Sequence, residues 1–279
     1  MIKIWYHRNC FDGFGAALAA WLKYGDTAEY YPVQYQSEYP TLEPGDELYI
    51  VDHSVKENHM NELLSISDNI TVLDHHKTAE EELSPFLASG QVKGLFDMDK
   101  SGAVLSWEFF QPGKPLPKLF HAIQDRDLWH FKCEGTNEVN MALQLLPLDF
   151  AKWQKFLDDE HFLTLIPRGK DLLKYHNRQV KQSKRNAFLC ELLGHEVPVV
   201  NLSTSSMISD VVGQLSDGYP FAACFFQVDN GWVYSLRSSN GFDVSELAKS
   251  MGGGGHQAAS GLKSDQIIHK IIRKLDVKK

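Results

Sequence analysis

The sequence contains no apolar run close to the ~18 residues that a membrane-spanning helix needs, so no membrane association is expected. Its 4 cysteines stand far apart without a CxxC pair, which argues against a disulfide framework and a structural zinc site. Basic residues number 28 against 36 acidic ones, and the net charge of -8 disfavours binding to long nucleic acid, which depends on neutralising phosphates. The opening segment MIKIWYHRNCFDG turns polar too early for a signal peptide. We therefore expect a cytoplasmic protein. The net charge does not exclude a short nucleotide as its ligand.

Short apolar runs alternate with helical patterns over the first hundred residues. The segments IKIWYH at 2–7, ELYIVD at 47–52 and NITVLD at 69–74 are typical of buried strands, and 13–25 is typical of a helix. Strands that alternate with helices indicate βαβ units and a mostly parallel sheet. In such sheets ligands bind beyond the carboxyl ends of the strands.

The length of 279 residues predicts about two domains. Residues 101–193 have a predominantly helical pattern, which ends in one long predicted helix over 168–193. Beyond it, strands are predicted at 196–202, 221–228 and 232–239, and helices at 205–218, 243–251 and 264–275. We therefore expect an α/β protein with a parallel-sheet N-terminal domain at 1–166, a linker helix at 167–194 and a smaller α/β domain at 195–279.

Each of the three predicted strands ends in residues that can bind metal ions. These are His7 after the first strand, Asp52 and His53 after the second, and Asp74, His75 and His76 after the third, while a later helix adds Asp125 and Asp127. A single Asp-His-His motif is weak evidence for a metal site, because such residues also cap helices or face water. Four clusters, three of them at strand ends, favour two divalent cations that share one carboxylate. The mixed nitrogen and oxygen donors suit Mn²⁺, with Mg²⁺ or Co²⁺ as alternatives.

The clusters also resemble those of a known family. The matching segments are HRNCFDG at 7–13, VDHS at 51–54, LDHH at 73–76, QDRD at 124–127 and GGGGHQAASG at 252–261. In this order they resemble the DHH phosphoesterase superfamily with its DHH-associated C-terminal domain. Within it the chain is similar to the compact, nanoRNase-like enzymes rather than to the RecJ-type exonucleases. The resemblance implies a metal-dependent oligoribonuclease or phosphodiesterase, which hydrolyses very short 5′-phosphorylated oligonucleotides to mononucleotides. Linear dinucleotides such as pGpG, from cyclic-di-GMP turnover, are included.

The resemblance further implies the ligands of two metal ions. His7, the Cys10 position and Asp52 would surround one ion, and Asp12, Asp52, His75 and Asp125 would surround the other. Asp52 would then bridge the pair. Asp127 competes with Asp125 for its place, although a salt bridge is the favoured role of Asp127.

The same resemblance implies roles beside the ions. His76 would contact the scissile phosphate or assist the leaving group, and Asp74 would orient the histidines by hydrogen bonding. Cys10 stands where the family usually has an aspartate. A thiol is a soft ligand, so His53 is an alternative at that place, with an ordinary hydrogen bond as its other reading.

The predicted C-terminal domain carries a second group of candidates. Four consecutive glycines allow main-chain N–H groups to approach an anion closely, although a flexible linker is the alternative. Arg237 ends a predicted strand and can bind a phosphate with two N–H groups. The resemblance implies a substrate-binding role in a cleft between the domains for Arg237, Gly253, Gly254, Gly255 and His256.

Several alternatives stay open at this point. The protein could be a phosphatase of a small bisphosphorylated nucleotide, or an inactive nucleotide sensor, for which the replaced aspartate at Cys10 is the only hint. The basic stripe on the long helix is expected to be a solvated face, and it consists of Lys174, Arg178, Lys181 and Lys184. No base-stacking role is assigned to the candidate aromatics, which are Trp129, Phe131, Trp153 and Trp232. The oligomeric state also stays open, with a homodimer as one option.

Overall fold

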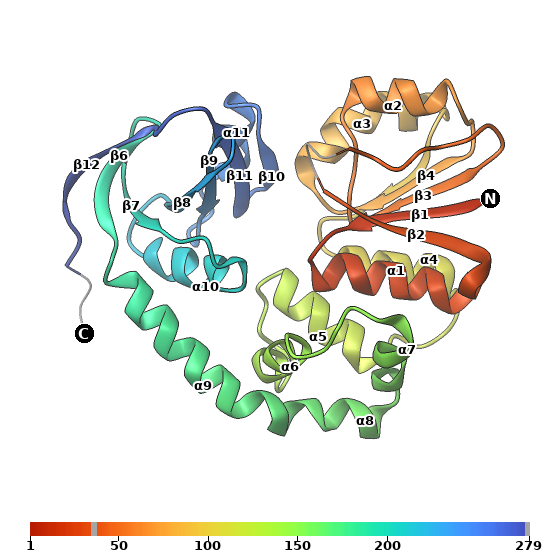
Figure 1. Ribbon diagram of the computed structural model, residues 1–279, viewed down its shortest axis with the longest axis horizontal. Helices are drawn as coiled ribbons and strands as arrows, with labels where there is room; N and C mark the ends of the chain where they lie inside the picture. The colour runs from red at the N-terminus through yellow and green to blue at the C-terminus, as the bar shows by residue number, and fades with distance from the viewer. Residues whose placement is uncertain (35–37, 277–279) are drawn as a thin grey trace. The chain divides into compact units, whose positions relative to one another are not determined.

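The computed structural model describes residues 1–34 and 38–276, and the chain divides into two compact units, Met1–Leu173 and Lys174–Lys279 (Figure 1). Each unit has its own sheet and its own buried apolar clusters. In the described ranges, no helix has the length and apolar character that crossing a membrane requires.

The first unit is built on a five-stranded parallel sheet with the order β2-β1-β3-β4-β5. Its strands are β1 (Ile2–His7), β2 (Ala28–Val33), β3 (Glu47–Val51), β4 (Ile70–Asp74) and β5 (Lys93–Phe96). The strands β1, β3 and β4 are buried almost throughout, which explains their continuous apolar sequences. The predicted α/β class and the three strands predicted in this region are confirmed.

Helices cover both faces of this sheet, and neighbouring residues of one strand pack on opposite sides. Ile4 and Val51 belong to the apolar cluster under α1 and α4, whereas Trp5 and Ile50 belong to the one under α2 and α3 (Figure 1). The helices are α1 (Phe11–Tyr24), the 3₁₀ turn η1 (Gly25–Thr27), α2 (Glu57–Leu64), α3 (Lys77–Ser89), α4 (Gly102–Phe110), α5 (Lys118–Asp127), α6 (Thr136–Leu143), α7 (Phe150–Trp153), the 3₁₀ turn η2 (Gln154–Leu157) and α8 (Asp159–Leu163).

The second unit follows α9 (Leu165–Lys184) and holds a seven-stranded sheet with the order β10-β11-β9-β8-β7-β6-β12. Only the β7–β8 pair is parallel among the strand pairs of the described residues in this sheet. The elements are β6 (Phe188–Leu192), β7 (His195–Asn201), α10 (Ser205–Leu215), β8 (Ala222–Val228), β9 (Gly231–Arg237), α11 (Val244–Ser250), β10 (Gly254–His256), β11 (Ala259–Ser264) and β12 (His269–Lys274).

Two predicted helices are wrong in part or in whole. The helix predicted over 168–193 ends at Lys184, and the residues beyond it form β6, which pairs with β7 and β12. The linker predicted at 167–194 therefore includes a strand of the second sheet. The helix predicted over 264–275 is replaced by β12, whose backbone hydrogen-bonds to the edge of β6. Its isoleucines recur at helical spacing, but strand pairing decided the local conformation.

Candidate metal centre

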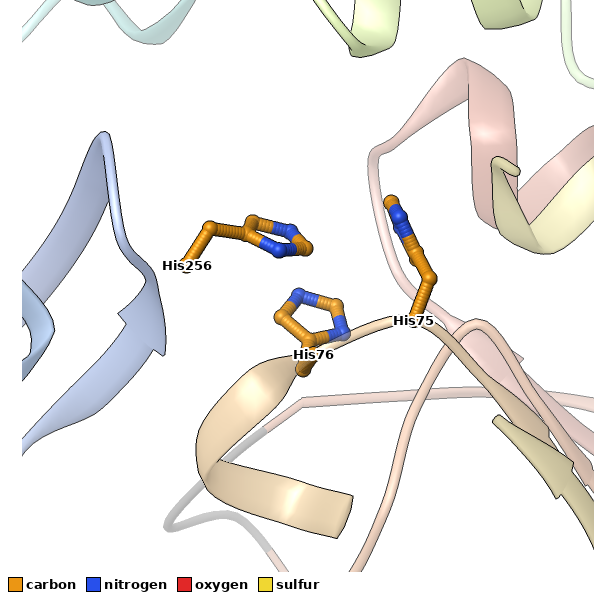
Figure 2. A group of neighbouring side chains, drawn as sticks. All are labelled: His75, His76 and His256. Atoms are coloured by element: carbon orange, nitrogen blue, oxygen red, sulfur yellow. The ribbon is translucent and has the colours of Figure 1, made fainter. Parts of the chain in front are cut away.

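The carboxyl ends of β1, β3 and β4 bring together side chains from three distant parts of the sequence. These strands are direct neighbours in the parallel sheet, so His7, Asp52 and the segment Asp74–His76 lie at one edge of it. Figure 2 shows His75 and His76 where the chain leaves β4 and enters α3. His256, also drawn there, belongs to β10 of the second unit.

Asp52 lies between two histidines. Its Oδ1 is 3.2 Å from His75 Nε2 and its Oδ2 is 3.6 Å from His7 Nδ1. Burial alone would raise the pKa of Asp52, but the two imidazoles outweigh it and hold that pKa well below its usual range. The residue has a φ of 51°, a left-handed conformation that an aspartate adopts at some cost in energy. The geometry suits the bridging position expected for Asp52.

Two glycines allow the helices to approach these side chains. A Cβ at Gly102, the first residue of α4, would lie 2.5 Å from the Cβ of Asp52. A Cβ at Gly13 in α1 would lie 2.4 Å from the carbonyl oxygen of His7. Neither contact is sterically allowed, so both positions require glycine. Gly102 was not predicted to be a site residue. It directly follows Ser101, the residue that caps α4, and a glycine after a helix-capping serine is a signal visible in the sequence.

Asp12 lies in the first turn of α1 and is held by the start of α4. The N–H groups of Gly102 and Ala103 donate to its two carboxylate oxygens over 2.6 and 3.0 Å. Its Oδ2 also lies 3.4 Å from His75 Nε2. Burial, and then the nearby Asp52 carboxylate, raise the pKa of Asp12 well above its usual range. A cation bound nearby would favour the ionised form of this carboxylate.

The structure places Asp127, and not Asp125, beside these residues. Asp127 Oδ2 lies 3.6 Å from His75 Nε2, so three carboxylates surround one imidazole. Asp125 is instead occupied by hydrogen bonds from the N–H groups of Lys132 and Cys133 and from the Thr136 hydroxyl. The expectation named Asp125 as the ligand and a salt bridge as the favoured role of Asp127, whereas the geometry favours Asp127 as the carboxylate beside His75. The loop clamped by Asp125 was not foreseen from the sequence.

Asp74 lies behind the two histidines that follow it. Its Oδ1 accepts the His75 main-chain N–H at 2.8 Å and lies 2.7 Å from His76 Nδ1. Burial lowers the pKa of His76, but the Asp74 carboxylate outweighs it and the pKa is raised overall. Among the described residues, Asp74 Oδ2 makes no hydrogen bond although it is buried. This arrangement fits the orienting role expected for Asp74.

Cys10 and His53 lie on the His7 side of Asp52. The candidate ligand atoms of His7, Cys10 and Asp52 lie within 4.8 Å of one another. Burial, and then the carboxylate of Asp52, raise the pKa of Cys10 well above its usual range, so the metal-free protein carries a neutral thiol there. His53 is fully buried, and its burial lowers its pKa to about 3. Its Nε2 lies 3.2 Å from the hydroxyl of Tyr39, a partner that was not predicted from the sequence.

The donor set fits divalent cations. We call His7, Cys10, Asp12, Asp52, His75 and Asp127 the candidate centre. Its ligand atoms form two neighbouring groups, one with His7, Cys10 and Asp52 and one with Asp12, His75 and Asp127, and Asp52 Oδ1 lies 3.2 Å from His75 Nε2 between them. Asp52 Oδ2 is buried and makes no hydrogen bond within the described ranges. Buried carboxylates that crowd each other in this way are stabilised by bound cations. Burial lowers the pKa of His75, but the surrounding carboxylates outweigh it and raise that pKa to about 10. In the metal-free protein a protonated His75 imidazole therefore offsets part of the negative charge of these carboxylates.

The residues expected to bind substrate lie in the second unit. Arg237, at the end of β9, donates to the Ser209 hydroxyl from Nε and Nη2 and to the Leu236 carbonyl from Nη1. The glycine run is not an open loop, because Gly254, Gly255 and His256 form β10 and pair with β11. A Cβ at Gly253 would lie 2.1 Å from the carbonyl oxygen of Gly261, so close strand packing explains this glycine.

Comparison with known proteins agrees with these observations. Residues 199–276 match the model of the DHHA1 domain. The chain is 34% identical over 280 residues to the uncharacterized protein R106 of Acanthamoeba polyphaga mimivirus, covering 92% of this chain and 66% of that protein. It is 24% identical over 304 residues to the oligoribonuclease NrnB of Bacillus subtilis, covering 96% of this chain and 74% of NrnB. This chain thus spans about two thirds to three quarters of the length of these relatives.

A solved structure is also similar. It is the pGpG-specific phosphodiesterase PggH of Vibrio cholerae, with 16% identity, a TM-score of 0.49 and coverage of 94% of this chain and 92% of PggH. The DHHA1 match, the NrnB relative and the Asp-His-His segment at the end of β4 agree with one another, and together they support the DHH phosphoesterase superfamily for this chain.

Proposed function

We propose that the protein is a metal-dependent phosphodiesterase that hydrolyses very short 5′-phosphorylated oligonucleotides to mononucleotides. Linear dinucleotides such as pGpG, the product of cyclic-di-GMP opening, are the expected substrates. The observation that carries the proposal is the gathering of Asp12, Asp52 and Asp127 around one imidazole of the Asp-His-His segment. Three carboxylates in that position form a site for cations.

Two cations would be held by overlapping groups of residues. His7 and Cys10 would hold one, Asp12, His75 and Asp127 would hold the other, and Asp52 would contact both. The mixture of carboxylate and imidazole donors suits Mn²⁺, and Mg²⁺ or Co²⁺ are the alternative ions. Bound divalent cations activate water and stabilise the negative charge that develops on a phosphate during displacement.

The chain itself supplies a proton-bearing group beside the cations. His76 is oriented by Asp74, which also raises the pKa of His76 against the effect of burial. A protonated imidazole can donate a hydrogen bond to a phosphate oxygen and a proton to the leaving oxygen. We therefore assign to His76 contact with the scissile phosphate, and to Asp74 the orientation of His75 and His76.

In the second unit we assign substrate binding to Arg237, whose guanidinium is held by Ser209, and to His256 on β10. The backbone N–H groups of Gly253, Gly254 and Gly255 are proposed as further donors to the substrate's phosphate. Since Gly253 and Gly255 are required by strand packing, substitution there would be expected to disturb the strand pairing itself.

The preference for short substrates rests on two observations. The relative NrnB is an oligoribonuclease by name. In addition, a net charge of -8 disfavours extended contact with the phosphates of long RNA. The same site in a phosphatase would remove a terminal phosphate from a bisphosphorylated nucleotide, and the products separate these two activities.

A substrate ladder tests the proposal. Purified protein is incubated with Mn²⁺ and 5′-phosphorylated RNAs of increasing length, from two to about ten nucleotides, and the products are resolved. We expect the dinucleotide to be cleaved fastest and the Asp52→Ala variant to be inactive with a lower metal content. Equal rates at all lengths would refute the length preference. Release of inorganic phosphate alone would favour the phosphatase, and binding without any cleavage would favour the sensor.

A further inference from the structure

Two large aromatic side chains are exposed in the segment that follows the proposed ligand Asp127. Trp129 is 40% exposed and Phe131 is 37% exposed. Their ring centroids are 5.2 Å apart in an edge-to-face arrangement, and the guanidinium carbon of Arg126 lies 5.0 Å from one ring centroid and 5.4 Å from the other. Single exposed aromatics are ordinary on protein surfaces. A group of two rings and one cation is a surface that binds flat, polarisable ligands.

The backbone that carries the rings is held in an unfavourable conformation. Trp129 and Phe131 have φ values of 57° and 51°, in the left-handed region that bulky residues rarely adopt. The conformation is maintained by Asp125, whose carbonyl oxygen accepts the N–H groups of His130 and Phe131 over 2.9 and 3.3 Å. Its buried carboxylate accepts those of the next two residues over 2.8 and 2.9 Å. Strain that is held in place by a buried polar residue is characteristic of functional sites.

The exposed rings follow directly on a proposed metal ligand. Asp127 is the last residue of α5 and lies 3.6 Å from His75, and Trp129 comes two residues later. Two residues of chain reach at most about 7 Å, so the backbone of Trp129 lies within about 7 Å of the backbone of Asp127. Both belong to the first unit, together with every member of the centre.

We propose that Trp129 and Phe131 form a stacking subsite for the nucleobase of the nucleotide whose phosphate lies at the candidate centre. This inference rests on the proposed function and deepens it, because it names a base-bearing nucleotide as the ligand. Every base has a π face, so stacking on the rings tolerates any base. The subsite therefore selects nucleotides over phosphoesters without a base, and it does so without reading sequence. Arg126 fixes the two rings and adds positive charge beside the phosphate.

Ligand binding tests the subsite without any need for catalysis. Adenosine 5′-monophosphate and ribose 5-phosphate, which lacks the base, are titrated into the protein in excess Mn²⁺ by calorimetry. For the natural protein we expect the nucleotide to bind roughly 10- to 100-fold more tightly. In Trp129→Ala and Phe131→Ala this preference should fall to a few-fold at most, while affinity for ribose 5-phosphate and for Mn²⁺ stays unchanged. Trp129→Phe should restore most of the preference, since it keeps a ring.

The control is Phe109→Ala, which removes an aromatic of similar exposure (41%) from α4. It should leave the preference for the nucleotide intact. The proposal is refuted if the natural protein shows no preference, if the alanine variants keep it, or if they lose ribose 5-phosphate and Mn²⁺ binding to the same degree. The last result would give the rings a purely structural role.

The two proposals can fail separately. If the natural protein prefers the nucleotide through these rings but cleaves no oligonucleotide, the subsite stands and the phosphodiesterase does not. If the protein cleaves dinucleotides and the alanine variants have an unchanged KM, the phosphodiesterase stands and the subsite is refuted.

Discussion

The substitution Gly102→Ala tests the geometry of the candidate centre without removing any ligand. The new Cβ would lie 2.5 Å from the Cβ of Asp52 and 2.7 Å from its Oδ1, whereas ordinary contacts begin at 3.4 Å. Asp52 or the start of α4 must therefore move by about 1 Å, and a shift of that size in a catalytic group can reduce the rate about 100-fold. By transition-state arithmetic this is a loss of about 2.7 kcal/mol. The Asp12 carboxylate would move as well, because the Gly102 N–H donates to it.

The assay combines Mn²⁺ titration of the metal-free protein with dinucleotide hydrolysis. We expect kcat/KM to fall about 100-fold and Mn²⁺ to bind more weakly, with overpacking destabilising the fold by about 1–3 kcal/mol. Ser106→Ala is the matched control in the same helix, since the buried Ser106 hydroxyl has no hydrogen bond within the described residues. If Gly102→Ala keeps both its Mn²⁺ affinity and its activity within about threefold of the control, Asp52 does not hold the cations.

Three further predictions concern single side chains. Asp127→Asn should weaken Mn²⁺ binding at least about tenfold without lowering the melting temperature, whereas Asp125→Asn should destabilise the fold by about 1–3 kcal/mol, because it disturbs the hydrogen bonds of the clamped loop. Cys10→Asp should tighten the weaker of two Mn²⁺ binding steps in calorimetry, because it replaces a neutral thiol by a hard oxygen ligand. Asp46→Asn should lower the free energy of unfolding at pH 7 by about 1–3 kcal/mol, since Asp46 is buried 2.8 Å from the ammonium group of Lys3.

The Asp46 prediction has a defined pH dependence. The Lys3 ammonium, and then the Glu43 N–H, hold the pKa of Asp46 below its usual range, so the folded state favours the ionised carboxylate. Its contribution is complete above the unfolded-state pKa of about 4 and is lost as the pH falls below that value. Denaturation by urea at several pH values should therefore show the natural protein and Asp46→Asn converging in acid. Asp68→Asn, at an exposed position, is the control.

Other outcomes would contradict the two predictions about the metal ligands Asp127 and Cys10. If Asp125→Asn loses Mn²⁺ while Asp127→Asn keeps it, the ligand suggested by the family resemblance is right and the structural assignment is wrong. Two equal Mn²⁺ affinities in the natural protein, or no change in the weaker step after Cys10→Asp, would show that the thiol position does not limit cation binding.

The parallel sheet could be predicted because its strands are buried on both faces. The runs 2–7, 47–52 and 69–74 are continuously apolar, so they could be recognised as strands without an alternation of apolar and polar residues. Each run ends in polar residues at the edge of the sheet where ligands bind. The strand β12 could not be predicted in this way. Its residues face solvent along most of their length, and Ile271 and Ile272 are exposed, so only pairing with β6 selects the extended conformation.

The choice between Asp125 and Asp127 was also beyond the sequence. The two residues are two positions apart at the end of one helix, so their side chains point in different directions. Which of them faces His75 depends on how α5 packs in the first unit, and both have the same chemistry. The resemblance favoured Asp125, while the hydrogen bonds to Lys132 and Cys133 give it another task.

The spread of the candidate centre along the chain has a consequence for biosynthesis. Its members come from residues 7 to 127, so a chain emerging from the ribosome can pair β1, β3 and β4 before α5 exists. Asp12, Asp52 and His75 would then meet without Asp127. Such an intermediate lacks one carboxylate and should capture cations only weakly. We expect the ions to be acquired after α5 docks, and the stabilisation of the docked helix to rise with the logarithm of the free metal concentration.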